Sequence, residues 1–423
     1  MKRALSLICV AAMAVAAVSQ TLEQCQQAAE RNYPLIARYG LIEKTTELTV
    51  ESIANVWLPQ VSASAQATVQ TDVPEFPDAM RNAYSQMGVD MKGLRRDQYR
   101  IGVDVQQLVY DGGASANRRE VARQQGQLQA AQTTADVYQV RQRVNDMYFA
   151  LLLVEEQIAL NNDLQEQLAA SEKKLQSMYR HGTAAECDYQ NVRAERLNAV
   201  QQMTTLNSQR QALRRMLATF CGIEITSLTK PAATPVAATA VSRPELDAID
   251  AQLRLIDERQ KAVDIALKPQ VGFFAQAFYG YPGFDMFHDM MSRNWTLNAL
   301  VGARVTWNIG GLYNRKTDLA KLQLEREWAE NSRDLFLFNN NLEQVQLNEI
   351  IDRYNRMLQQ DDEIIALRAS IRHAAESKLA HGIIDANDLV REVTAENAAR
   401  IQRSIHEIEM LKEIYNLKFV TNN

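Results

Sequence analysis

Hydrophobic residues recur at every third or fourth position along two very long stretches of the chain. In the stretch 113–179 they are Val137, Val140, Val144, Met147, Leu151, Val154 and Ile158, and in the stretch 313–379 they include Leu347, Ile350, Tyr354, Met357, Ile364 and Ile371. This spacing is that of a coiled-coil seam. A shorter helical pattern follows each stretch, over 186–218 and 385–419. We therefore expect two long antiparallel helical hairpins.

The two expected hairpins turn on similar sequences that lie 200 residues apart. The first turn contains His181, Gly182, Thr183 and Asp188, and the second contains His381, Gly382, Ile383 and Asp388. Proline-glutamine pairs at 59–60 and 269–270 also recur, as do glycine pairs at 112–113 and 310–311. Because self-similarity at a fixed offset indicates internal repetition, we expect two repeats, 20–222 and 243–423. The segment 223–242, which is rich in alanine, threonine and proline, is then a linker.

Two shorter helices are expected, at 21–55, where Thr21 is a favourable N-cap, and at 243–267. Each is roughly half as long as a long helix, at about 1.5 Å per residue. A short helix stacked end to end with a return helix would therefore match one long helix. We expect each long helix to have such a composite antiparallel partner.

The apolar period changes from 3.6 to 2 in four other stretches. The apolar positions are Val61, Ala63, Ala65, Ala67 and Val69, then Tyr99, Ile101, Val103 and Val105, then Val271, Phe273, Ala275, Ala277, Tyr279 and Tyr281, and finally Trp295, Leu297, Ala299, Val301, Ala303, Val305 and Trp307. The second stretch changes phase near Gln107. Each alternation extends over about 10 to 13 residues, which exceeds the usual globular strand and is enough for a tilted strand to cross a bilayer. We expect four transmembrane β-strands.

Polar loops and aromatic residues flank these strands at opposite ends. The loops 71–98 and 282–294 are long and polar, as extracellular loops of membrane barrels are. At the other ends lie Trp57, Tyr110 and Trp307, whose amphipathic rings favour a membrane interface. The alternative is an ordinary antiparallel sheet on a soluble core, because aromatic residues at strand ends are common.

The first 19 residues have the pattern of a cleaved export signal. Lys2 and Arg3 precede an apolar run at 4–18, and Ala17 and Ser19 are small residues at the expected cleavage site. The run is shorter than the about 20 apolar residues of a transmembrane anchor. Without Lys2 and Arg3 the 46 basic residues become 44, against 51 acidic residues, which is a net charge of −7. An acidic chain of this kind argues against nucleic acid as a partner.

Residue patterns typical of enzymes or cofactor sites do not stand out. The five histidines, His181, His288, His373, His381 and His406, form no pair with metal-ligand spacing. We find no phosphate-binding loop, nucleophile elbow or cysteine-histidine arrangement. We therefore expect no enzymatic activity, no cofactor and no metal.

Three cysteines, Cys25, Cys187 and Cys221, remain after removal of the leader. An odd number cannot form a complete disulfide framework. Cys25 begins the first short helix and Cys221 follows the first return helix, so these two are expected near each other. They are either buried free thiols or a disulfide, while Cys187 is expected to stay reduced at the first turn.

Four strands cannot close a barrel alone. An open sheet edge in lipid leaves unsatisfied backbone groups, which cost several kcal/mol each. Two copies would give eight strands with an interior filled by side chains, whereas three copies would give twelve strands and a lumen. We expect a homotrimer with a shared twelve-stranded barrel.

This layout resembles the TolC-like outer membrane efflux protein family. The resemblance covers the whole mature chain and rests on the duplicated order of elements, the proline-glutamine strand entries, the glycine-glycine exits and the first turn with Tyr179, Gly182 and Asp188. It implies an α+β membrane protein, a trimeric channel-tunnel with a periplasmic α-barrel and transmembrane strands in outer membrane lipid. Its implied role is a passive exit duct of a tripartite efflux or type I secretion system, with a periplasmic adaptor (membrane fusion) protein and an inner membrane transporter as partners.

The resemblance also implies roles for the turns. The adaptor would dock on His181, Gly182, Thr183, His381, Gly382 and Ile383. Asp188 and Asp388 would narrow the periplasmic mouth, with Asp388 favoured for a cation-attracting ring and Asp188 for contacts that hold the mouth shut. Two departures from the family are expected. Many relatives carry a lipidated N-terminal cysteine, which we do not expect here, and the second turn has no aromatic residue three positions before Gly382.

The rival interpretation is a soluble periplasmic coiled-coil scaffold or adaptor protein. Adaptors also contain a helical hairpin, but they have one hairpin rather than two. The long alternating strands with aromatic ends favour the channel.

Overall fold

The computed structural model describes residues 19–234 and 241–422. The expected export signal lies outside the described residues except for Ser19, and so do residues 235–240 of the expected linker. The chain divides into two compact units. We call them the hairpin unit, with residues up to 39, 131–248 and from 332 onward, and the sheet unit, with residues 40–130 and 249–331.

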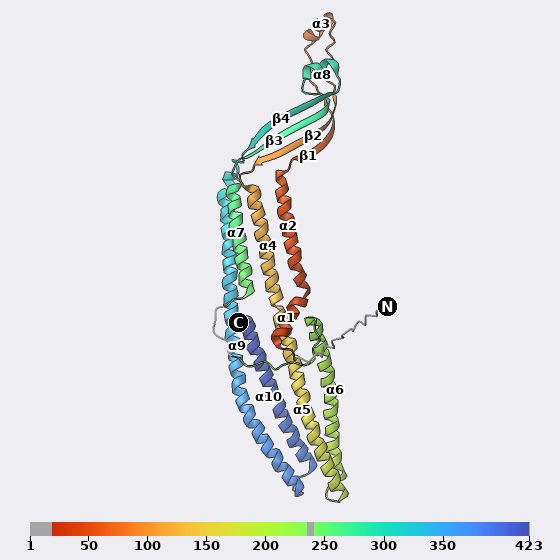
Figure 1. Cartoon of the computed structure of the whole chain (residues 1–423), viewed down its shortest axis with the longest axis vertical. Coiled ribbons are helices and arrows are strands. Elements are labelled where there is room, and N and C mark those ends of the chain that lie inside the picture. Colours follow the sequence, from red (N-terminus) through yellow and green to blue (C-terminus); the bar gives the residue numbers. More distant parts are fainter. Residues whose placement is uncertain (1–18, 235–240, 423) are drawn as a thin grey trace, which may run out of the picture. The chain divides into compact units, whose positions relative to one another are not determined.

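Two antiparallel helix pairs build the hairpin unit (Figure 1). Helix α5 (Val140–Arg180) pairs with α6 (Glu186–Cys221), and the C-terminal part of α9 (Gly311–Ala380) pairs with α10 (Ala386–Thr421). Helix α10 also packs against α5, and the short α1 (Leu22–Asn32) packs against α5 and α6. The two hairpins expected from the hydrophobic spacing are confirmed.

Two large buried clusters lie in the hairpin unit, beside smaller ones. The first gathers around α1 and the middle of α5 and includes Leu22, Cys25, Val144, Tyr148, Phe149, Leu217, Cys221 and Ile414. The second, which we call the turn cluster, consists of Leu164, Leu168, Leu175, Val192, Ala199, Ala375, Leu379, Ala386, Leu389 and Val393. Because the turn cluster draws side chains from all four long helices, both hairpins share one core near their turns.

The expected continuous helix 21–55 is wrong, because the structure divides it in two. Helix α1 starts at the Thr21 cap with a capping box formed with Gln24, and it ends at Asn32. A 3-10 turn η1 (Pro34–Ile36) follows, and α2 (Ala37–Ala54) then continues. Pro34 has no N–H to donate to the preceding turn, so the helix cannot run through it.

The expected unbroken helix 113–179 is also wrong, since α4 (Ala114–Tyr138) and α5 meet at Gln139. The Gln139 N–H lies 3.4 Å from the Ala135 carbonyl, a long helical hydrogen bond. Tertiary contacts engage both residues at the break. Tyr138 stacks on Phe419 with ring centroids 4.8 Å apart, and the Gln139 amide donates to Glu245 at 2.7 Å.

A four-stranded antiparallel sheet organises the sheet unit, in the order β1 (Gln60–Val69), β2 (Asp97–Tyr110), β3 (Gln270–Tyr281) and β4 (Thr296–Thr306). The four strands expected from the alternation are confirmed. The register of β2 on β3 shifts between Leu108 and Tyr110, where the sequence changes phase. A 3-10 turn η2 (Asn55–Trp57) leads from α2 into β1, and α7 (Pro244–Ile265) leads into β3.

One face of the sheet carries two glycine-phenylalanine pairs. Phe278 lies opposite Gly102 and Phe274 opposite Gly302 on the neighbouring strands. An added Cβ at Gly102 would lie 2.9 Å from the Cβ of Phe278, and one at Gly302 would lie 2.7 Å from the Cζ of Phe274. Both glycines therefore make room for a ring. The Arg100 guanidinium lies 3.8 Å from the Phe278 ring centroid, and that of Arg304 lies 4.9 Å from the Phe274 centroid.

The two long loops are more ordered than their polar sequences predict. Each contains a short helix, α3 (Asp78–Gln86) in the first loop and α8 (Met286–Ser292) in the second. The loops also contact each other. The Lys92 N–H donates to the Met290 carbonyl at 3.1 Å, and the Arg293 guanidinium donates to the Gly93 carbonyl at 3.0 Å.

Candidate functional site

The two hairpin turns have the same backbone geometry. Each ends its first helix with a pair of hydrogen bonds typical of a Schellman motif. The bonds run from Thr183 to Met178 and from Gly182 to Tyr179 in the first turn, and from Ile383 to Lys378 and from Gly382 to Leu379 in the second, at 2.9 to 3.0 Å. Gly182 and Gly382 have φ angles of +75° and +68°. Glycine adopts this left-handed region without a Cβ penalty.

The histidines before these glycines also match. The Nδ1 atoms of His181 and His381 lie 2.7 Å from the carbonyl oxygens of Ser177 and Ser377. Because a carbonyl oxygen only accepts, each Nδ1–H donates. We call the exposed residues of the two turns the turn surface: His181, Gly182, Thr183, His381, Gly382 and Ile383.

The two aspartates after the turns have different roles at their helix starts. The Asp188 carboxylate accepts from the backbone N–H of Ala185 at 2.9 Å, which is one half of a capping box, since alanine has no side-chain acceptor to complete it. Asp388 instead donates its backbone N–H to the Asp385 carboxylate at 2.9 Å. The Asp388 carboxylate lies 3.5 Å from Arg391. The equal spacing in the sequence therefore does not make the two carboxylates equivalent.

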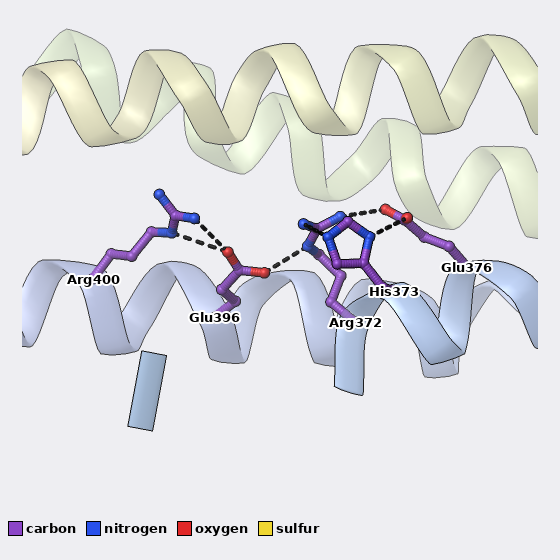
Figure 2. A network of polar contacts seen from close by, with 5 residues as sticks. All are labelled: Arg372, His373, Glu376, Glu396 and Arg400. Carbon is purple, nitrogen blue, oxygen red and sulfur yellow. Dashed lines mark hydrogen bonds and ion pairs between the residues drawn. The ribbon is translucent and has the colours of Figure 1, made fainter. Parts of the chain in front are cut away.

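A buried carboxylate joins α9 to α10 above the second turn (Figure 2). The Glu396 side chain is 2% exposed and accepts from Arg372 Nε at 2.5 Å and from Arg400 at 2.7 and 3.0 Å. Arg372 also bonds Glu376 at 2.5 Å. Burial raises the pKa of Glu396, but the hydrogen bonds from Arg372 and Arg400 more than offset it, so that the pKa lies below its usual value. The carboxylate is therefore held in its charged form.

The first hairpin has a corresponding ion pair between its two helices, with the positions of the acid and the base exchanged. Glu172 lies on α5 and Arg196 on α6, and the Arg196 Nε donates to the Glu172 carboxylate at 2.7 Å. These positions are 200 residues before Arg372 and Glu396. The long helix thus carries the acid in the first hairpin and the base in the second.

Three expected interface aromatics lie at one end of the sheet. By register, this end holds the start of β1 and β3 and the end of β2 and β4. The Trp57 indole donates to the Ser115 hydroxyl at 3.0 Å, and the Trp307 indole donates to the Leu267 carbonyl at 2.8 Å. Trp57, Tyr110 and Trp307 are 38%, 50% and 57% exposed. Each ring is thus partly free to contact a membrane interface.

Sequence reasoning missed three side chains that organise the second turn and the helices beside it. Asp385 is the N-cap of α10, Arg391 lies beside Asp388, and Glu396 ties the hairpin above it. The sequence does contain a signal for Asp385, because an aspartate directly before a helical pattern is a common N-cap. Glu396 gave none, because its partner on α9 depends on how the helices pair.

The residues that the structure describes contain no group of three or more histidine, cysteine or acidic side chains that could hold a metal ion. Among the same residues, no helix is long and apolar enough to cross a membrane.

The fold and the sites together define a class of protein with two long helical hairpins and a four-stranded antiparallel sheet. Solved outer membrane channels share this fold. The MtrE outer membrane channel of Neisseria gonorrhoeae, in its open state, gives a TM-score of 0.65 at 14% identity, covering 95% of this chain and 89% of that chain. The CmeC outer membrane channel of Campylobacter jejuni gives a TM-score of 0.64 at 12% identity, covering 95% of this chain and 85% of that chain.

CusC, whose structures describe conformational changes that accompany folding and transmembrane channel formation, gives a TM-score of 0.67 at 11% identity, covering 96% of this chain and 92% of that chain. No protein-family model matches the sequence, and no curated protein sequence does. The expected TolC-like fold is confirmed by these structures, which match nearly the whole chain.

Proposed function

We propose that the chain is an outer membrane channel-tunnel, the passive exit duct of a tripartite efflux or type I secretion system. The observation that carries the proposal is the combination of a four-stranded sheet with long alternating strands and two helical hairpins that share one core at their turns. This combination matches solved outer membrane channels over about 95% of the chain. The function is that of a pore, so no side chain is assigned a catalytic role.

The sheet supports assembly into a homotrimer. Its order leaves β1 and β4 as edge strands within the chain. In a bilayer such edges must be paired, and only a closed barrel pairs them all. Three copies give twelve strands and a lumen, whereas two copies give eight strands with a filled interior. The face with Arg100, Asp104 and Arg304 is then the lumen face, and the face with Ile101 and Val301 meets lipid.

The turn surface supports docking of a periplasmic adaptor. Its six residues are exposed, and identical backbone geometry would present two similar surfaces per protomer. An adaptor that binds both turns would connect the channel to an inner membrane transporter. Trp57, Tyr110 and Trp307 would lie at the periplasmic interface of the outer membrane.

The two aspartates give the proposal its sharpest test at residue level. In a trimer each aspartate becomes a ring of three carboxylates, and such rings attract cations in a narrow pore. Asp388 is proposed for the cation ring and Asp188 for contacts that keep the mouth closed. Single-channel recordings in planar bilayers would compare Asp388→Asn and Asp188→Asn with the wild type. We expect lower cation selectivity for the first variant and higher resting conductance for the second. Unchanged currents in both variants would leave only a role at the helix starts.

The channel itself is tested by fractionation, mass and conductance of the full-length exported protein. We expect it in the outer membrane fraction, extractable only with detergent, with a trimeric mass in mild detergent and ion conductance in planar bilayers. Recovery as a monomer from the periplasmic fraction without detergent would favour the alternative, a soluble coiled-coil scaffold or adaptor protein.

A further inference from the structure

Two cysteines from distant parts of the chain meet in the core of the hairpin unit. Cys25 lies on α1 and Cys221 is the last residue of α6. Cys25 is 0% and Cys221 is 2% exposed, and both are free thiols. The Cys221 thiol lies 3.4 Å from the carbonyl oxygen of Cys25. The sequence expectation that these cysteines lie near each other is confirmed.

Hydrogen bonds fix α1 beside the end of α6 on both sides of this pair. Before α1, the Gln20 N–H donates to the Ser227 carbonyl at 3.0 Å, and the Thr229 N–H donates to the Gln20 carbonyl at 3.1 Å. At the end of α1, the Asn32 amide donates to the carbonyls of Thr219 and Phe220 at 3.3 and 3.2 Å. Cys221 is therefore held beside Cys25 by bonds that do not involve sulfur. Such preorganisation raises the effective concentration of one thiol at the other.

The third cysteine cannot compete once α6 has formed. Cys187 is exposed and lies near the start of α6, whereas Cys221 lies at its end. At about 1.5 Å of rise per residue, one continuous helix separates them by about 50 Å. A disulfide needs Cα atoms within about 7 Å.

The thiols also differ in acidity. A hydrogen bond from the Cys221 thiol lowers the pKa of Cys25, and the same bond together with burial raises the pKa of Cys221. Both shifts belong to the docked state of α1, in which the two thiols are buried together.

We propose that Cys25 and Cys221 form a disulfide that fastens α1 to the end of α6. This inference rests on the proposed function in one respect, since it requires export to an oxidising compartment. The oxidant is the disulfide of a protein thiol oxidoreductase. The thiolate of one cysteine attacks one sulfur of that disulfide, giving a mixed disulfide and releasing one thiol. The other cysteine, once deprotonated, then attacks the sulfur of the first and releases the second thiol, so two protein thiols are oxidised and one carrier disulfide is reduced.

Burial of both sulfurs fixes the order of events. A protein oxidoreductase cannot reach thiols that are 0% and 2% exposed, so the exchange takes place before α1 docks. The finished disulfide is shielded in the same way. Dithiothreitol should reduce it at least about tenfold more slowly in the native protein than in denaturant, because native reduction requires local opening.

The test counts thiols in the full-length protein purified from membranes. Cells are quenched in acid, and the protein is denatured, alkylated with N-ethylmaleimide without reductant, and weighed by mass spectrometry. We expect one adduct, on Cys187. Matched variants give the assignment: Cys187→Ser should take no adduct, while Cys25→Ser and Cys221→Ser should each take two. Three adducts on the wild type would overturn the inference for the exported protein.

A second experiment tests whether the two cysteines pair, independently of the compartment that the chain reaches. The purified chain is reduced, denatured, and refolded in detergent in a buffer of oxidised and reduced glutathione. We expect a Cys25–Cys221 disulfide, and failure to form it there would overturn the pairing itself. A disulfide in glutathione with three free thiols in cells would instead show that the chain does not reach an oxidising compartment, which would count against the proposed function.

Discussion

Three glycines with positive φ end helices of the hairpin unit, but their surroundings differ. An added Cβ at Gly182 or Gly382 would meet nothing within 4 Å. Gly222 follows α6 with φ +68°, and an added Cβ there would lie 2.6 Å from the Cγ of Asn32. Asn32 caps the α6 carbonyls, so a side chain at Gly222 would also remove that cap.

Alanine at these positions should therefore have unequal costs. We expect Gly182→Ala to lower the free energy of unfolding by about 1 kcal/mol, the cost of a left-handed backbone for a residue with a Cβ. Gly222→Ala should cost about 2 kcal/mol or more, because the loss of helix capping adds to it. Urea unfolding of the detergent-solubilised protein, followed by circular dichroism, measures both. Equal costs would contradict the role given to Asn32.

The buried Glu396 makes stability depend on pH. Removing one partner of a buried ion pair costs about 3 to 5 kcal/mol, since the other charge stays buried. We therefore expect Glu396→Gln to be strongly destabilised at pH 7, whereas Glu376→Gln, with a 42% exposed side chain, should change little. Urea unfolding at several pH values checks both variants.

The sign of the pH dependence follows from the lowered pKa of Glu396. Its contribution is fully present above the ordinary glutamate pKa of 4.5 and is lost as the pH falls through the lower pKa of the folded state. The difference between wild type and Glu396→Gln should therefore shrink below about pH 4.5. A difference that stays constant down to pH 3 would show that packing, and not charge, makes Glu396 important.

At the scale of elements, the reversed charges of the two hairpins specify which helices pair. Glu172 on α5 faces Arg196 on α6, while Arg372 on α9 faces Glu396 on α10. Helix α10 also packs on α5 in the native fold, but if α10 took the place of α6 as the hairpin partner of α5, Glu172 would meet Glu396, and like charges repel. Both correct pairings are attractive, so the reversal favours the native partners over the exchanged ones.

A charge exchange within the first hairpin tests this interpretation. Glu172→Arg should destabilise the protein, because Arg193 and Arg196 lie 4.0 and 2.7 Å from the Glu172 carboxylate. Adding Arg196→Glu should recover most of the loss, with a coupling free energy of about 1 kcal/mol for this partly exposed pair. The control is Glu172→Arg with Arg210→Glu, which lies about 21 Å farther along α6. Recovery in the control would point to net charge rather than pairing.

The elements differ in how far sequence predicts them. The long hairpins, the four strands and the Thr21 cap were predictable, because each is a local pattern of period or capping. The break at Gln139 was not, since it depends on Phe419 and Glu245, which are far away in the sequence. Pro34 indicates a helix break in the sequence, but the helical pattern continues beyond it and so predicted a single helix. The exchanged positions of acid and base in the two interhelical ion pairs could be recognised only from the structure, which shows which helices pair.

At the scale of the whole molecule, the recurrence of sequence features is most regular where the two hairpins share a core. The turns lie 200 residues apart, and so do the ion-pair residues Glu172 and Arg372. The strand entries at Pro59 and Pro269 lie 210 residues apart. Spacing thus varies outside the hairpins and stays constant inside them. The turn cluster supplies a physical reason, because it packs side chains of both hairpins against one another.

The shared turn cluster constrains how such a chain can change length during evolution. Two extra heptads, one in α5 and one in α6, would carry the first turn beyond the second by about 10 Å, at about 1.5 Å per residue. The apolar side chains that now cover each other would then be exposed. A lengthening tolerated by the fold must therefore occur in both halves of the gene, in all four helices together. Relatives of this chain with longer or shorter hairpins should carry their insertions or deletions as matched sets.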